Sequence, residues 1–142
     1  MDRLYTCDNS TNHIIYEHDP DTLVVINSVA IPSVSSTGIG GVLNRLYTCE
    51  VTTDSFHEHN TDTLSVINSG SAPNISSNGI GGVSSRLYSC DQYVDEIYEH
   101  NKDTFTVTNT VSSPNVVITG IGGVSERLYS CDSFPDNIYE HN

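Results

Sequence analysis

Hydrophobic residues occur along this chain in short runs that are separated by clusters of turn-forming residues. One representative set of four runs is 75–83 (ISSNGIGGV), 86–91 (RLYSCD), 96–101 (EIYEHN) and 103–111 (DTFTVTNTV). Each run has the usual length of a β-strand, and none shows the three-to-four spacing of an amphipathic helix. Alternation is clear in the last run, so we expect Phe105, Val107 and Asn109 to share one strand face. The pattern predicts an all-β chain.

The same runs recur along the chain with nearly constant spacing. The phrase RLYTCD or a close variant starts at Arg3, Arg45, Arg86 and Arg127, so successive starts are 42, 41 and 41 residues apart. A period near forty is typical of stacked supersecondary units. We therefore divide the single domain, 1–142, into repeats 3–44, 45–85 and 86–126 and a partial repeat 127–142.

Four strands within about 41 residues match the size of one blade of a β-propeller. In such a blade the first strand lines the central axis and the fourth lies at the rim. The first run contains GIGG in three copies, and glycine permits the close approach that strands near an axis require. A phosphate-binding loop is the competing interpretation, but no helix follows these glycines to supply an N-terminal dipole. We therefore predict a β-propeller built from four-stranded blades.

The order of the runs also resembles the NHL and YVTN classes of β-propeller repeat. In these classes a Gly-Ile strand leads into a strand of the form [IL]-Y-V-x-D, as GIGGV leads into RLYSCD here. The match spans essentially the whole chain. It departs from the classes in the Cys that follows each RLY motif and in the Glu-His of the third run. The resemblance implies the propeller architecture and no single function, because such propellers include scaffolds, binding modules and hydrolases.

The balance of charge argues against two classes of partner. The chain has 18 acidic and 5 basic residues, a net charge of −13, and four of the basic residues are the repeated arginines. Cations this few and this regularly placed form no basic stripe for phosphates, so we expect neither nucleic acid nor an anionic membrane as a partner. The acidity itself is typical of a solvated surface that resists aggregation.

The cysteines and the lack of targeting signals predict a reducing compartment. No segment approaches about 18 consecutive apolar residues, and the N-terminal residues MDRLYTCDNS lack the apolar run of a secretory signal. One cysteine occupies the same position of each repeat: Cys7, Cys49, Cys90 and Cys131. Equivalent positions of stacked units lie farther apart than a disulfide allows. We expect four buried free thiols in the cytoplasm or another reducing compartment.

A Glu-His pair ends the third run of every repeat, with the glutamates at Glu17, Glu58, Glu99 and Glu140. Adjacent strand residues point to opposite faces, so one pair cannot chelate one ion, and we predict neither a metal nor another cofactor. An antiparallel hairpin of the second and third runs brings the start of one near the end of the other. We therefore predict that the arginine of each repeat, at Arg3, Arg45, Arg86 and Arg127, pairs with this Glu or a neighbouring carboxylate.

Carboxylates also recur at the ends of other runs, where such side chains normally cap turns. They close the second run at Asp8, Glu50, Asp91 and Asp132 and open the fourth at Asp21, Asp62 and Asp103. Tyrosines recur on the second and third runs, with His57 at one equivalent position. We expect these aromatic residues to pack between blades, and the alternative is stacking on a sugar ring.

The copies differ most in their loops, where any specificity would reside. These loops are NSTNH, VTTDS, QYVDE and SFPDN, together with the segments around Pro32, Pro73 and Pro114. We predict no catalytic residue, because near-identical repeats supply no asymmetric cluster and no G-x-S-x-G motif occurs.

The number of runs does not complete a propeller. The chain opens with the second, third and fourth runs, continues with two full sets and stops after the first three runs of another. Closed propellers have about 4–8 blades, so one chain cannot close, and an open array would expose unpaired edges. We expect a homodimer, with six blades favoured, a spare hairpin of second and third runs in each chain, and eight blades as the runner-up. The alternative is a fragment of a longer propeller.

These features favour a non-enzymatic binding or scaffold module that self-assembles, possible ligands being a glycan, bound as by a lectin, or a protein. One alternative is a propeller hydrolase or lactonase with a metal in the axial channel. Another is an amplified or designed repeat protein, or a fragment, that has no ligand.

Overall fold

The computed structural model describes residues 3–10, 12–31, 35–74, 76–114, 116–134 and 136–141. Within these ranges the chain forms 14 β-strands, and no helix there is long and apolar enough to cross a membrane. The strands build four antiparallel sheets that follow one another along the chain. The prediction of an all-β chain with its strands in this order is therefore confirmed.

The two end sheets have three strands and the two middle sheets have four. Sheet 1 has the order β1-β2-β3, sheet 2 β4-β5-β6-β7, sheet 3 β8-β9-β10-β11 and sheet 4 β12-β13-β14. Within the described ranges, sheet 1 therefore lacks the first strand of a set of four, and sheet 4 lacks the last.

We name the strands by their place in a set of four. The inner strands are β4 (Ser36–Val42), β8 (Ser77–Val83) and β12 (Ile118–Val124). The second strands are β1 (Leu4–Cys7), β5 (Arg45–Glu50), β9 (Arg86–Asp91) and β13 (Arg127–Asp132). The third strands are β2 (Ile14–His18), β6 (Ser55–His59), β10 (Glu96–His100) and β14 (Ile138–His141). The outer strands are β3 (Val25–Ala30), β7 (Val66–Ser71) and β11 (Val107–Ser112). The outer turns, which connect third to outer strands, are residues 19–24, 60–65 and 101–106.

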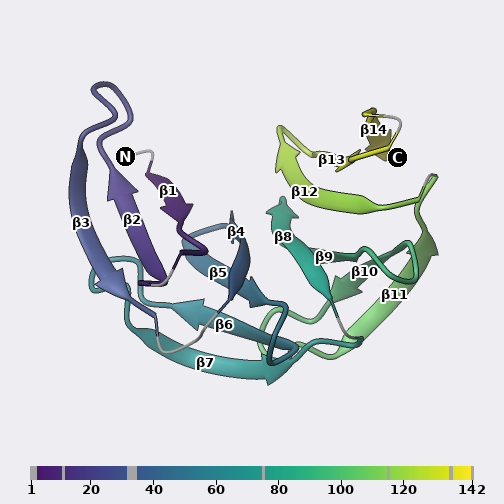
Figure 1. The fold of residues 1–142 in the computed structure, drawn as a ribbon, viewed down its shortest axis with the longest axis horizontal. Helices are drawn as coiled ribbons and strands as arrows, with labels where there is room; N and C mark the ends of the chain where they lie inside the picture. The colour runs from purple at the N-terminus through teal and green to yellow at the C-terminus, as the bar shows by residue number, and fades with distance from the viewer. Residues whose placement is uncertain are drawn as a thin grey trace.

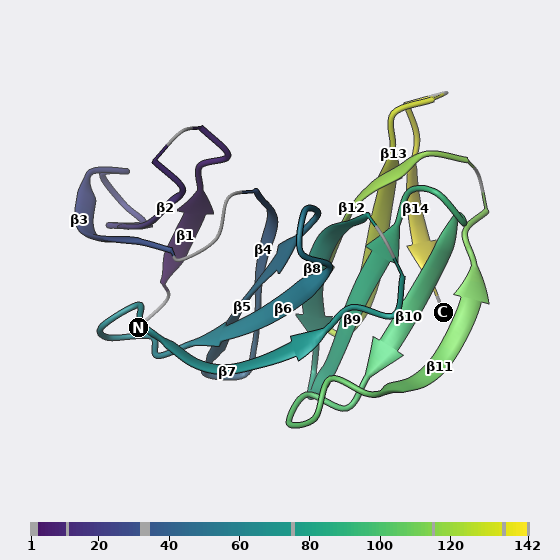
Figure 2. The ribbon, with the colours of Figure 1, turned by 60° about the horizontal axis from the view of Figure 1, so that its bottom comes forward.

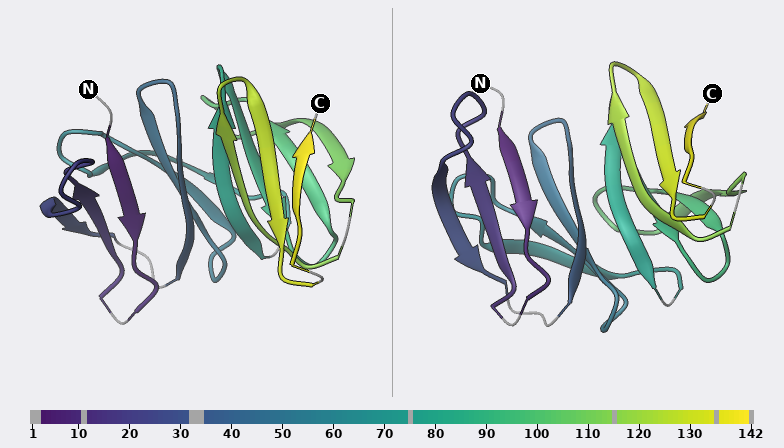
Figure 3. Two further views of the ribbon diagram at one scale, coloured as in Figure 1. Left: turned by 90° about the horizontal axis from the view of Figure 1, so that it is seen from above. Right: turned by 45° about the horizontal axis from the view of Figure 1, so that its top comes forward.

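The four sheets stand side by side along an arc that stays open on one side (Figure 1). The inner strands lie toward the middle of the arc and the outer strands along its outside. Figure 2 shows sheets 2 and 3 as separate, twisted units that pack against each other. The first and last strands, β1 and β14, lie in the end sheets, at opposite ends of the array (Figure 3).

Glycines allow the inner strands to approach one another closely. A Cβ atom on Gly81 would lie 2.7 Å from the backbone oxygen of Ile121 in the next inner strand, and one on Gly40 would overlap the backbone oxygen of Ile80. The predicted reason for the GIGG sequence is confirmed at these two positions. A Cβ atom on Gly122 of β12, in contrast, would meet nothing within 4 Å.

The outer strands begin later than predicted. We expected the fourth run of the third repeat to be a strand over 103–111, but β11 starts at Val107. Phe105 therefore does not share a strand face with Val107 and Asn109, and that prediction was wrong. Its side chain is buried, whereas every residue of β11 is exposed.

The cause is a capped turn with a left-handed residue. The side-chain oxygen of Asn101 accepts hydrogen bonds from the backbone N–H groups of Asp103 (2.9 Å) and Thr104 (3.1 Å). Phe105 then adopts a φ of 59°, which reverses the chain before the strand can start. Leu23 and Leu64 have φ values of 60° and 58° at the equivalent positions.

In sheets 1 to 3, the histidine at the end of the third strand contacts both the second strand and the outer turn. In sheet 2, Nδ1 of His59 lies 3.0 Å from the backbone oxygen of Leu64 in the outer turn. Its Nε2 lies 2.9 Å from Oγ1 of Thr48 on the second strand. Because a carbonyl oxygen only accepts, Nδ1–H donates, and the neutral ring accepts the threonine hydroxyl at Nε2. His100 makes the same two kinds of contact in sheet 3, and burial lowers the pKa of both His59 and His100.

Protonation of these two histidines is expected to destabilise the fold. Their pKa in the folded state lies below the value of about 6.5 for an unfolded chain. The folded state therefore binds fewer protons, and the free energy of unfolding decreases as the pH falls from about 6.5 toward the folded-state pKa. We expect urea denaturation to show lower stability at pH 5 than at pH 7, and the His59→Gln/His100→Gln double variant to show a smaller decrease.

The comparison stays at pH 5 and above because carboxylates with a lowered pKa, such as Glu99 beside Arg86, titrate below about 4.5. An unchanged pH dependence in the double variant would contradict the role assigned to the two rings.

Candidate functional site

An arginine–glutamate pair lies in every sheet, as predicted. In sheet 2, Nε and Nη2 of Arg45 donate to the two carboxylate oxygens of Glu58 at 2.6 and 2.7 Å. In sheet 3, Arg86 contacts Glu99 in the same two-point manner, with 2.6 Å between Nε and Oε1, and this hydrogen bonding lowers the pKa of Glu99. The end sheets repeat the pair with longer distances, 3.4 Å for Arg3–Glu17 and 3.1 Å for Arg127–Glu140.

Arg45 also reaches the neighbouring sheet, a contact that sequence reasoning missed. Its Nη1 pairs with the carboxylate of Asp103, and Nη2 donates to the backbone oxygen of Lys102 at 3.1 Å. Both acceptors lie in the outer turn of sheet 3. Asn68 of β7 donates to the backbone oxygen of Asp103 at 3.0 Å. The hydrogen bond from Arg45 lowers the pKa of the Asp103 carboxyl group.

The same arrangement joins sheets 1 and 2. Nη2 of Arg3 donates to Oδ1 of Asp62 at 2.7 Å, and Nδ2 of Asn27 donates to the backbone oxygen of Asp62 at 3.1 Å. We predicted that Asp62 and Asp103 cap their turns, but the caps are Asn60, whose Oδ1 accepts from the backbone N–H of Asp62 at 2.9 Å, and its equivalents. The aspartates instead present a negative charge to the preceding sheet.

Each outer turn also carries an apolar side chain, which in sheets 2 and 3 is buried against the preceding sheet. We call this residue the plug: Leu23, Leu64 or Phe105. We call the residues that receive it, one each on the second, third and outer strands, the socket. In the boundary between sheets 1 and 2, the Leu64 plug belongs to one buried cluster with Ile15, against which Tyr5 and Val29 pack.

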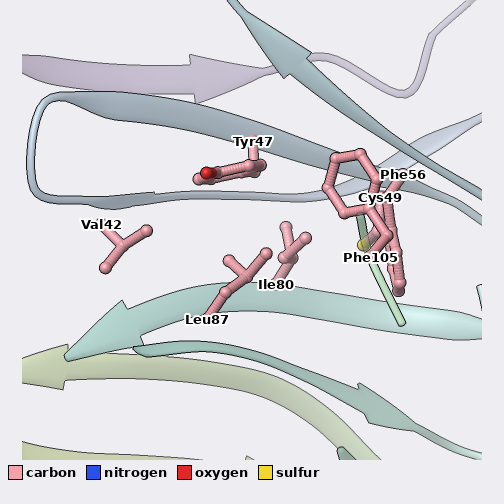
Figure 4. Packing of buried hydrophobic residues seen from close by; sticks show 7 residues of the cluster. All are labelled: Val42, Tyr47, Cys49, Phe56, Ile80, Leu87 and Phe105. Atoms are coloured by element: carbon pink, nitrogen blue, oxygen red, sulfur yellow. The ribbon is translucent and has the colours of Figure 1, made fainter. Parts of the chain in front are cut away.

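A larger plug fills the boundary between sheets 2 and 3. The ring of Phe105 packs with Tyr47 and Phe56, with centroids 6.0 and 5.9 Å apart, and the close-up shows it beside Phe56 and Cys49 (Figure 4). The expectation that a repeated tyrosine packs between blades is confirmed for Tyr47. Gly70 of β7 completes this socket, because a Cβ atom there would lie 2.5 Å from the Phe105 ring.

Carboxylates at the ends of second strands cap turns as predicted, with one exception. Oδ1 of Asp91 accepts the backbone N–H groups of Tyr93 and Val94 at 2.7 and 3.2 Å. Asp8 likewise accepts the N–H of Ser10, and Asp132 accepts that of Asn137, farther along its loop. The exception is Glu50, whose Oε2 accepts the hydroxyl of Thr53 at 2.6 Å.

Glu50, His57 and Ser69 form a row of polar contacts in sheet 2. The buried Oε1 of Glu50 lies 3.1 Å from Nε2 of His57, and Nδ1 of His57 faces the Ser69 hydroxyl at 2.8 Å. Serine, histidine and glutamate in contact resemble a nucleophile with its base. However, Oε1 makes no aligned hydrogen bond despite the short distance, and the three hollows described below are lined by other residues.

The four cysteines are free, as predicted. Cys49 and Cys90 are buried, and burial raises the pKa of the Cys49 thiol to about 12. Cys7 and Cys131 are only partly buried, which differs from the prediction. The reason is their place in the end sheets, which have a neighbouring sheet on one side.

Three hollows lie along the sheet boundaries. One of about 160 Å³ lies between sheets 3 and 4 and is lined by Arg86, Tyr88 and Val111, among others. One of about 720 Å³ lies between β1 and β4 and is lined by Tyr5 and Gly40, among others. The third follows the isoleucines and glycines of the inner strands. No group of three or more potential metal-binding side chains gathers among the residues that the structure describes.

The loops predicted to carry specificity lie at the margins of the sheets. Pro73 and Pro114 lie between an outer strand and the next inner strand, and Pro32 lies outside the described residues. Tyr93, in the loop between β9 and β10, is exposed.

The fold resembles β-propellers of known structure. The glutaminyl cyclase of Myxococcus xanthus matches with a TM-score of 0.78 over 98% of this chain and 67% of its own, at 16% identity. The WD40 repeats of RRP9 match with 0.74 over 97% of this chain and 44% of theirs, at 7% identity. The computationally designed Ika4 protein matches with 0.68 over 99% of this chain and 85% of its own, at 8% identity.

Likeness at these identities shows the fold alone, so the chain is a partial β-propeller. It spans two thirds of the cyclase and less than half of the WD40 protein. No family model and no curated protein matches the sequence. The propeller architecture is confirmed, and the NHL or YVTN class stays a prediction.

Removing Arg45 is expected to cost more stability than removing Arg127. The Arg45→Met variant leaves the buried Glu58 without its partner and Asp103 without its cross-sheet contact, which should lower the free energy of unfolding by about 2–3 kcal/mol. Arg127 and Glu140 are both largely exposed, so Arg127→Met is the matched control and should cost at most about 1 kcal/mol. Urea denaturation at pH 7 measures both, and equal losses would argue against the cross-sheet role of Arg45.

Proposed function

We propose that this chain is a non-enzymatic binding or scaffold module that completes a β-propeller by self-association, as a homodimer. The observation that carries the proposal is the pair of incomplete end sheets. Among the described strands, sheet 1 has no inner strand and sheet 4 no outer strand. Both ends leave strand edges and apolar side chains in solvent, an arrangement prone to uncontrolled association unless a defined partner covers it.

A second copy of the chain offers the complementary end to each open end. Two copies related by a two-fold axis, the commonest oligomer symmetry, bury both pairs of ends in one closed ring. The ring has six blades if the end sheets of the two copies merge, and eight if each is kept. We favour six blades, since merging supplies the strands that the end sheets lack.

The ligand class that fits such a module is a glycan or a protein. The exposed Tyr93 offers an aromatic face of the kind on which sugar rings stack. Because the loops of the repeats differ in sequence, a closed ring would present several related but distinct sites. The net charge of −13 disfavours nucleic acid and anionic membranes.

The alternative function, a propeller hydrolase or lactonase with an axial metal, needs carboxylates or imidazoles along the axis. The hollow along the inner strands is lined by isoleucine and glycine, which offer no such ligand. A stoichiometric metal ion in the purified protein would favour this alternative. The remaining alternative is an amplified or designed repeat protein, or a fragment of a longer propeller, that has no ligand.

A cytoplasmic or other reducing compartment suits the four free thiols. Cys49 and Cys90 pack in the buried clusters between sheets, where they serve as small apolar residues.

The absolute mass in solution tests the self-association. One chain has a mass of 15.5 kDa, so light scattering on a sizing column should give one discrete species of about 31 kDa. A monomer at every concentration, or a broad distribution of aggregates, would contradict the proposal. Binding of the discrete species to immobilised glycans, with the same glycan free in solution as a competitor, then tests the lectin-like function.

A further inference from the structure

We propose that the outer turn of sheet 1 in one copy, residues 19–24, docks into the socket of sheet 3 in a second copy. This inference rests on the proposed self-association and names the contact that produces it. The plug Leu23 of one copy meets Tyr88, Ile97 and Val111 of the other, and Asp21 pairs with Arg86.

The two filled sockets of the chain follow a size rule. The socket of the Leu64 plug has Val29 on its outer strand, paired in register with Ile15. The socket of the larger Phe105 plug has Gly70 at the same place in the register. Since a Cβ atom on Gly70 would press against the ring, a phenylalanine plug requires glycine and a leucine plug accepts valine.

Sheet 3 has a complete socket, and no plug occupies it within the described chain. Tyr88, Ile97 and Val111 line the hollow of about 160 Å³, and Ile97 pairs with Val111 in the same register. The set Tyr, Ile and Val is the one that receives leucine at the boundary of sheets 1 and 2. The vacant socket therefore fits a leucine plug.

Sheet 1 has the matching plug. Leu23 is 65% exposed, whereas Leu64 is 0% and Phe105 4% exposed. The turn around Leu23 is nevertheless held as in the docked cases, with Nδ1 of His18 3.1 Å from the backbone oxygen of Leu23. Oδ1 of Asp19 accepts the backbone N–H of Thr22 at 2.8 Å. The plug is thus presented in its docking conformation, which lowers the ordering cost of association.

The polar groups around the socket and the turn are complementary. The side chain of Arg45, which reaches the next outer turn, is 23% exposed, whereas that of Arg86 is 55% exposed. Asn109 lines the same hollow, at the register position from which Asn68 binds an outer turn. Asp21 is exposed on the turn of sheet 1 and supplies the carboxylate and backbone oxygen that both donors can bind.

The inner strands provide a third, independent match. The hollow of about 720 Å³ between β1 and β4 lies where sheet 1 would have an inner strand. At the other end of the array, the Gly122 face of β12 is open and Val124 is exposed. Seating β12 in this hollow places Gly122 beside Gly40 of the second copy, as Gly40 lies beside Gly81 within the chain. Two chains then supply six inner strands to one ring.

Docking in this way makes one hairpin of each chain redundant. The hairpins β1–β2 and β13–β14 would occupy the same place beside β12, and their sequences are nearly the same, RLYTC against RLYSC and IIYEH against NIYEH. The first of these carries His18 and leads directly into Asp19, the residues that hold the docking turn. The hairpin β13–β14 is therefore the one displaced, and each junction blade has the order β12 of one copy, then β1-β2-β3 of the other.

A change of plug size tests the docking in the 142-residue chain. Leu23→Phe should raise the dissociation constant at least tenfold, because the ring meets Val111 in the socket. Adding Val111→Gly should restore association by reproducing the pair of Phe105 and Gly70. Ile67→Phe, which makes a similar enlargement at an exposed residue of β7, is the matched control and should leave the dissociation constant unchanged. Sedimentation over a dilution series gives the constants, and circular dichroism confirms that each variant is folded.

A charge exchange tests which sheet receives the turn. Asp21→Arg and Arg86→Asp should each weaken association several-fold, and the two together should restore it. Restoration by Arg127→Asp instead would place the turn against sheet 4 and overturn the docking, with the self-association intact. A dimer indifferent to all of these changes would overturn it too, whereas a wild-type chain that stays monomeric would overturn the proposed function itself.

Discussion

The insertion of an outer turn into the sheet before it is the interaction on which this structure depends. The strand hydrogen bonds run within single sheets, so the turns and the stacked inner strands hold neighbouring sheets together. One turn supplies an apolar plug, an aspartate for an arginine and backbone oxygens for polar donors. Burying a leucine or phenylalanine is worth about 1.5–3 kcal/mol, and a partly exposed ion pair at most about 1 kcal/mol. The plug therefore provides most of the affinity, and the charged pair favours the correct partner.

The same interaction gives the ends of the array opposite and complementary surfaces. A sheet with an outer strand offers a socket to the sheet that follows and a turn to the sheet that precedes it, so an array of such sheets has a free turn at its start and a free socket near its end. In this chain the free turn carries leucine and the free socket carries valine, the combination found at the boundary of sheets 1 and 2. A specific contact between copies thus requires no surface that the repeat does not already use internally.

Sequence reasoning predicted the strands and their order because period and alternation are strong signals in this chain, and the Arg–Glu pairs followed from hairpin geometry. It missed the outer turns, because DTFTVTNT has the composition of a continuous strand and the Asn101 cap and left-handed Phe105 override that propensity. The reach of Arg45 to Asp103 depends on how neighbouring repeats are placed, which the pattern within one repeat does not specify. One signal was available in the sequence. The second repeat has Gly70 where the other repeats have valine, and the next repeat has Phe105 where the other repeats have leucine.

The most direct test of this account is a crystal structure of the species that sizing chromatography isolates at the dimer mass. We expect a closed ring of six blades in which β12 of one copy pairs with β1 of the other and Leu23 lies against Tyr88, Ile97 and Val111. Two chains joined at another surface, with Leu23 in solvent and the sheet 3 socket unfilled, would contradict it.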